Sequence, residues 1–65
     1  MGLRIVLADD HQVVRDGLRL LLESRGGHVV LGEAADGLAA VRLAEKLRPE
    51  VLLVDLSMPG LPGLE

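Results

Sequence analysis

The chain has three short runs that are largely apolar, separated by two longer segments in which apolar residues recur at helical spacing. The runs cover residues 3–8, 28–34 and 51–54, and runs of this length bounded by turn residues are typical of strands. The third run is apolar at every position and β-branched at both ends, so we expect a strand buried on both faces. The resulting order of strand, helix, strand, helix, strand favours an α/β fold, a parallel sheet covered by helices.

The two intervening segments predict amphipathic helices. Asp10 is placed to cap the first helix, and the pair Gly26–Gly27 is expected to end it. The second helix is predicted over about residues 38–48, with Asp36–Gly37 as a turn and cap before it and Pro49 beyond its end. The apolar face of the first helix consists of Val14, Leu18, Leu21 and Leu22, and that of the second begins with Leu38, Val41 and Ala44.

The composition narrows the classes of function. The chain has 65 residues, no cysteine and no aromatic residue, so its core must consist of aliphatic side chains. Its net charge is −3 and no basic cluster is present, which argues against direct nucleic-acid binding. No apolar run is long enough for a membrane span, and the first residues do not form a signal peptide, so we expect a cytoplasmic location.

Three carboxylates follow two of the predicted strands. Asp9 and Asp10 come after the first strand, and Asp55 comes after the third. If these strands are neighbours, the three groups converge at one edge of the sheet and repel one another, so either one of them keeps a proton or a cation joins them. Oxygen ligands without His or Cys suit Mg²⁺, and a carboxylate beside that ion can attack a phosphoryl group.

The same residues carry a family resemblance. Residues 7–11 (Leu-Ala-Asp-Asp-His) and 54–63, which include Met58, Pro59 and Gly60, resemble the receiver domain of two-component response regulators of the LuxR type. The resemblance implies a flavodoxin-like fold in which Asp55 accepts a phosphoryl group from a histidine kinase or a small phosphodonor. It also implies that Asp9 and Asp10 hold Mg²⁺, together with Asp55 and the backbone carbonyl of Ser57.

The resemblance covers the whole chain but only the N-terminal half of a receiver, whose five strands have the order 2-1-3-4-5. We therefore expect residues 1–65 to form a partial receiver domain, a truncated flavodoxin-like unit with a parallel three-stranded sheet in the order 2-1-3. The third strand would then be an edge that pairs readily with another chain. We expect a homodimer formed through this edge, which would complete the fold.

Three functions stay open from the sequence. The first is a receiver module that is phosphorylated on Asp55 with Mg²⁺, and the second is a self-associating interaction module without chemistry. The third is a small metal-dependent hydrolase, although the residues favour a chain that is not an enzyme. His11 follows the acidic pair, and we expect it to be a partly exposed residue of the first helical turn rather than a catalytic base.

Overall fold

The computed structural model describes residues 2–55 and contains every predicted element within that part of the chain. Where both are defined, each observed bound is identical to the predicted one or differs from it by one residue. The Met58–Gly63 loop of the sequence motif lies outside the described residues. The elements are β1 (Arg4–Ala8), α1 (Gln12–Arg25), β2 (Val29–Ala34), α2 (Gly37–Leu47) and β3 (Val51–Val54).

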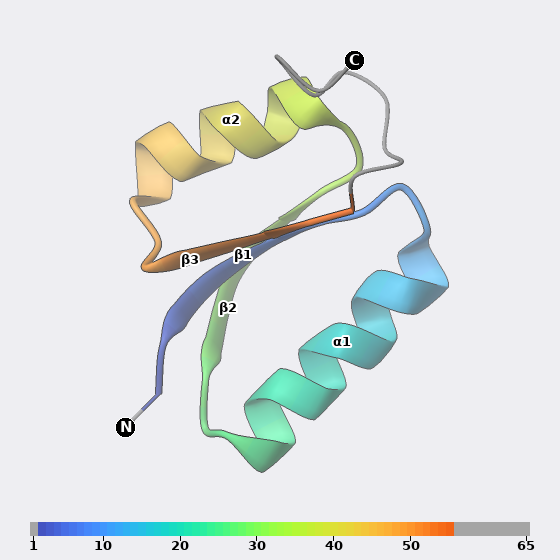
Figure 1. Ribbon diagram of the computed structural model, residues 1–65, viewed down its shortest axis with the longest axis vertical. Helices are drawn as coiled ribbons and strands as arrows, with labels where there is room; N and C mark the ends of the chain where they lie inside the picture. The colour runs from blue at the N-terminus through green and yellow to red at the C-terminus, as the bar shows by residue number, and fades with distance from the viewer. Residues whose placement is uncertain (1, 56–65) are drawn as a thin grey trace.

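The three strands form one parallel sheet in the order β2-β1-β3, which confirms the predicted topology. The central strand β1 pairs with β3 without interruption, from Ile5 opposite Val51 to Ala8 opposite Val54. Its pairing with β2 shifts register between Ile5 and Val6. Figure 1 shows α1 on one face of the sheet and α2 on the other, so the unit has three layers.

The core lies on both faces of β1. On the α2 face, Ala8, Ala34 and Ala40 pack together, and their small side chains allow the helix to approach the sheet closely. On the α1 face, the buried residues are larger, and Leu18 and Leu22 of the helix pack against them. The sheet residues of this second cluster are Ile5, Leu7 and Val30.

The expectation that the third strand is buried on both faces is wrong. Leu52 and Leu53 point to opposite faces of the sheet, and each is 38% exposed. The reason is the position of β3, which pairs with β1 on one side and has no partner on the other among the described residues. The expectation of an edge strand is confirmed, and β1 is the strand that is buried on both faces.

The predicted apolar face of α1 is only half correct. Leu18 and Leu22 contact the sheet, whereas Val14 and Leu21 are exposed. These two residues lie to one side of the line along which the helix touches the sheet.

The face of α2 that packs on the sheet is not the predicted one. Gly37 and Ala40 are the buried residues of this helix, while Leu38 and Val41 are exposed. Several overlapping stripes of the helix are apolar, and the stripe with the smallest side chains packs on the sheet because it allows the closest approach. Leu43 joins this contact as a partly buried residue.

The helix ends agree with the sequence signals at three of four positions. The side chain of Asp36 accepts a hydrogen bond from the backbone N–H of Ala39 at 2.8 Å, which caps α2 as predicted. Gly27, with φ of +63°, follows the end of α1. Arg48 ends α2 in the left-handed region, directly before Pro49.

Candidate functional site

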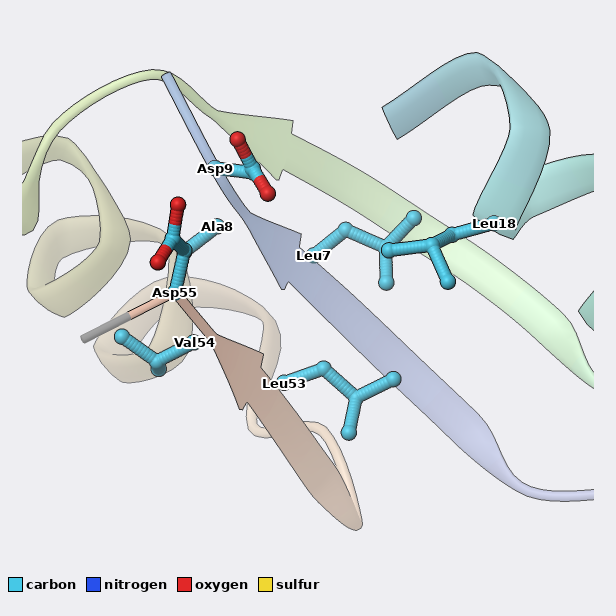
Figure 2. Close-up of a pocket in the computed structure, with 7 residues that line it drawn as sticks. All are labelled: Leu7, Ala8, Asp9, Leu18, Leu53, Val54 and Asp55. Atoms are coloured by element: carbon cyan, nitrogen blue, oxygen red, sulfur yellow. The ribbon is translucent and has the colours of Figure 1, made fainter. Parts of the chain in front are cut away.

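The carboxyl ends of β1 and β3 lie side by side and bring two acidic residues to the same edge of the sheet. The backbone N–H of Asp55 donates to the carbonyl of Ala8 at 2.9 Å, and the N–H of Asp9 donates to the carbonyl of Ala34 at 3.0 Å. These bonds extend the sheet pairing by one residue on each side. Figure 2 shows Asp9 and Asp55 at the ends of neighbouring strands, just beyond Ala8 and Val54.

The turn after β1 holds a third carboxylate and an imidazole. Asp9 is 8% exposed, and its Oδ1 accepts the backbone N–H of His11 at 2.8 Å and lies 3.0 Å from Nδ1 of the same residue. Oδ1 of Asp10 lies 2.9 Å from the same Nδ1. Nδ1 of His11 therefore contacts the carboxylates of both Asp9 and Asp10.

The prediction that Asp10 caps α1 is wrong. His11 is the residue that precedes the helix, and no side chain accepts a hydrogen bond from the first turn of the helix. The reason is that the two Asp side chains are engaged with His11 instead. The helix therefore begins without the stabilisation that Asp36 provides for α2.

The carboxylates change the protonation of His11. They raise the pKa of its imidazole above the ordinary value of 6.5, first through the hydrogen bond with Asp9 and then through the negative charges of Asp10, Asp9 and Asp55. The ring itself is well exposed to water, so desolvation opposes this shift only weakly. The cluster thus attracts positive charge.

The four side chains are close enough to share one cation. Ligand atoms of Asp9, Asp10, His11 and Asp55 all lie within 4.8 Å of one another. Three of these four groups are carboxylates, which are the donors that Mg²⁺ prefers, so the donor set fits this ion.

A cavity of about 370 Å³ lies next to these groups. Leu7, Leu18 and Leu53 supply its apolar wall, and Asp9 and Asp55 lie at its polar end (Figure 2). The cavity lies on the α1 face of the sheet, where the side chain of Leu53 is partly exposed. The acidic group is thus bordered by an apolar surface.

The structure brings Asp9, Asp10 and Asp55 together, as expected for neighbouring strands, whereas Ser57 lies outside the described residues. The exposure expected for His11 is confirmed, with 64% of its side chain accessible. It precedes the helix rather than belonging to the first turn, and its contact with both carboxylates was not predicted. The only signal in the sequence is its position directly after the acidic pair.

Comparison with known proteins gives the chain its family. Residues 5–65 match the model of the response regulator receiver domain. The chain is 48% identical over 62 residues to the transcriptional regulatory protein YdfI of Bacillus subtilis, covering 95% of this chain and 29% of that protein. It is 44% identical over 61 residues to the nitrate/nitrite response regulator NarL of Escherichia coli, covering 94% of this chain and 28% of NarL.

Solved structures agree with this match. A LuxR-family two-component response regulator from an Aurantimonas species superposes with a TM-score of 0.85 at 45% identity, covering 92% of this chain and 43% of that one. The receiver domain of a NarL-type regulator from Mycobacterium tuberculosis gives a TM-score of 0.86 at 42% identity, covering 91% and 48%.

The comparisons agree on which part of the related regulators this chain matches. The match lies in the receiver portion of the regulators, and the chain spans less than a third of the length of YdfI and NarL. Within residues 2–55, no helix has the length and apolar character needed to cross a membrane. Members of the matched family are generally not enzymes. The fold, the acidic edge of the sheet and the sequence match together show that the chain belongs to the receiver domain family of two-component response regulators.

Proposed function

We propose that this chain accepts a phosphoryl group on the carboxylate of Asp55, with Mg²⁺ held by Asp9, Asp10, Asp55 and the backbone carbonyl of Ser57. The observation that carries the proposal is the grouping of the three carboxylates at the carboxyl ends of β1 and β3, with ligand atoms within 4.8 Å of one another. Asp9 and Asp10 follow β1, and Asp55 follows β3. The pairing of these two strands keeps the backbones that carry the carboxylates close together.

The family supports this proposal. Receiver domains generally bind Mg²⁺ at an acidic site, and they interact with histidine kinases or phosphodonors. Bound at this position, Mg²⁺ would offset the negative charge on the oxygens of the phosphoryl group. The donor atoms present fit this ion better than a softer metal, because three of the four are carboxylates.

The chemistry asked of Asp55 is a simple displacement. One carboxylate oxygen forms a bond to phosphorus, and the bond from phosphorus to the donor breaks. The leaving group takes the electron pair of that bond, and the product on the chain is an acyl phosphate. Asp9 and Asp10, which both contact Nδ1 of His11, would hold Mg²⁺ next to Asp55.

The proposal extends to the organisation of the chain. We propose that residues 1–65 form a partial receiver domain and that the donor is a histidine kinase or a small phosphodonor. The chain has no cysteine, which suits the reducing cytoplasm where we place it. Its net charge is −3, so we propose that it does not contact nucleic acid directly.

The test is intact-mass spectrometry after incubation of the chain with Mg²⁺ and acetyl phosphate. We expect one phosphoryl adduct on the wild type, and none on Asp55→Asn or after removal of the metal. Glu50→Gln is the matched control, because Glu50 carries the same charge at the opposite end of β3, where it pairs with Arg4. This control should form the adduct as readily as the wild type.

A second candidate function is self-association through the edge of β3. The specific observation is that Leu52 and Leu53 are exposed on this strand, whose outer side has no partner among the described residues. Such an edge offers backbone donors and acceptors to another strand. Sedimentation of the chain tests it: a homodimer at micromolar concentration is expected, and a folded monomer would contradict it.

A further inference from the structure

Four charged side chains between α1 and β2 form a cluster that is separate from the acidic site. Oε2 of Glu33, on β2, lies 2.9 Å from Nη1 of Arg19, and its Oε1 lies 3.9 Å from Nη1 of Arg15. Glu23 pairs with Arg19 along the helix, with Nε and Oε1 3.5 Å apart. Glu33 is the one member of the cluster that belongs to the sheet, so it ties both arginines of α1 to a strand.

Glu33 faces the helix close to the acidic edge of the sheet. It lies opposite Leu7 in the pairing of β1 with β2, and both side chains point to the α1 face. Asp9 follows Leu7 by two residues and therefore shares this face, where both residues border the cavity. The contact of Glu33 with the helix thus lies beside the strand end that carries Asp9.

The start of α1 has few other contacts that fix its position. No side chain caps it, and its first apolar residues are exposed. The first residue of this helix in the apolar core is Leu18. Arg15 lies before it, and the backbone N–H of Arg15 donates to the carbonyl of His11 at 3.0 Å. The pairing of Arg15 with Glu33 therefore acts on the turn that carries Asp10.

We propose that Glu33 is a positioning residue for the metal site. By pairing with Arg15 and Arg19, it holds the start of α1 against the sheet. It thereby sets the distance between Asp10, in the turn before the helix, and Asp55, at the end of β3. The inference rests on the proposed function, because it assumes that these two carboxylates share one Mg²⁺ ion.

The loss of Glu33 would act mainly through Arg15. The side chain of Arg15 is only 16% exposed, and its Nε has no hydrogen-bond partner within the described part of the chain. Removing one partner of an ion pair that is shielded from water leaves an uncompensated charge. Arg15 would then move toward water together with the start of α1, and Asp10 would move with it.

Calorimetric titration of the full 65-residue chain with Mg²⁺ tests the proposal. Glu33→Gln should raise the dissociation constant about threefold to tenfold, less than the loss of a ligand would. Glu23→Gln is the matched control, since it removes an equal charge that also pairs with Arg19 but leaves the tie to the strand intact. This control should stay within about twofold of the wild type. Circular dichroism verifies that each variant is folded.

Arg15→Gln separates positioning from the effect of charge alone. Loss of a positive charge near the carboxylates would by itself strengthen the binding of Mg²⁺. Loss of the tie to Glu33 should instead weaken this binding about threefold. Arg15→Lys keeps the charge and most of the reach, so it should bind Mg²⁺ within about twofold of the wild type.

NMR of the metal-free chain gives a readout that does not depend on the ion. The ring signals of His11 should shift in Glu33→Gln and stay in place in Glu23→Gln. Unchanged ring signals in Glu33→Gln, equal Mg²⁺ affinity in the two variants, or tighter binding in Arg15→Gln would overturn the inference and leave the proposed function standing. A folded wild-type chain that binds no Mg²⁺ would overturn both.

Discussion

Two strand-to-helix turns leave the same end of the sheet, and each carries an aspartate directly before or close to its helix. In the turn from β2 to α2, Asp36 accepts a hydrogen bond from Ala39 and caps the helix. In the turn from β1 to α1, Asp9 and Asp10 contact His11 and face Asp55, and the helix has no side-chain cap. The turn from β2 to α2 uses its carboxylate to cap a helix, whereas the carboxylates of the turn from β1 to α1 cap none and lie in a cluster with His11 and Asp55.

This difference shows how one residue type serves two purposes in neighbouring turns. A carboxylate that accepts a backbone N–H of its own helix lowers the free energy of the fold. Carboxylates that gather with others raise it through repulsion, unless a cation binds. The turn that costs stability is therefore the turn expected to bind Mg²⁺. Substitutions in the two turns should consequently have opposite effects on ion binding and on folding.

The largest effect is expected on ion affinity. Asp9→Asn removes one charged ligand from the most buried position of the cluster, so the dissociation constant for Mg²⁺ should rise about tenfold to a hundredfold. Asp36→Ala should leave it unchanged within about twofold. Calorimetric titration of the two variants measures both values, and an equal loss in both would remove the distinction between the turns.

The next effect is expected on folding in the absence of metal. Asp36→Ala loses the cap of α2 and should lower the free energy of unfolding by about 1 kcal/mol. Asp10→Ala removes a carboxylate that caps nothing and that repels its neighbours, so it should lower this free energy far less or raise it. Urea unfolding followed by circular dichroism checks both, and a larger loss in Asp10→Ala would contradict the comparison.

A cap can also be introduced where it is missing. His11→Ser places a favoured capping side chain before α1 and should raise the free energy of unfolding by about 0.5–1 kcal/mol. The measurement belongs at a pH above the pKa of His11, where the wild-type ring is neutral and its attraction to the carboxylates is small. If the midpoint of urea unfolding does not rise, water already accepts the hydrogen bonds of the backbone N–H groups at the start of α1.

The smallest effect concerns protonation. The carboxylates raise the pKa of His11 in the fold above its ordinary value of 6.5. The imidazolium therefore stabilises the fold fully below pH 6.5, and this contribution is lost as the pH rises through the higher pKa of the folded state. NMR titration of the ring in the metal-free chain should give a pKa above 6.5, lower in Asp10→Asn. A pKa at or below 6.5 in the wild type would contradict this.

Much of the fold follows from local signals in the sequence. Gly26–Gly27, Asp36 and Pro49 mark the helix ends, and apolar runs mark the strands. The strand order followed from the family resemblance, since local pattern alone does not define neighbours. The helix faces were less predictable, because Leu, Val and Ala form overlapping stripes and close packing against Ala8 and Ala34 decides which stripe is buried.

The site was predictable as a group of residues but not in its contacts. The positions of Asp9, Asp10 and Asp55 after their strands, together with the strand order that the resemblance implies, predicted that they converge. The contact of His11 with two carboxylates depends on the backbone conformation of the residue before α1, which the pattern of apolar and polar residues does not specify. The same conformation explains why Asp10 does not cap the helix.

The measurement that tests the central claim most directly is the location of the phosphoryl group after reaction with acetyl phosphate and Mg²⁺. Borohydride reduction of the acyl phosphate followed by peptide mapping identifies the modified residue. The account predicts modification of Asp55 alone, lost in Asp9→Asn at low Mg²⁺ and retained in Asp36→Ala. A folded chain that forms no adduct, or that is modified at another carboxylate, would contradict the claim.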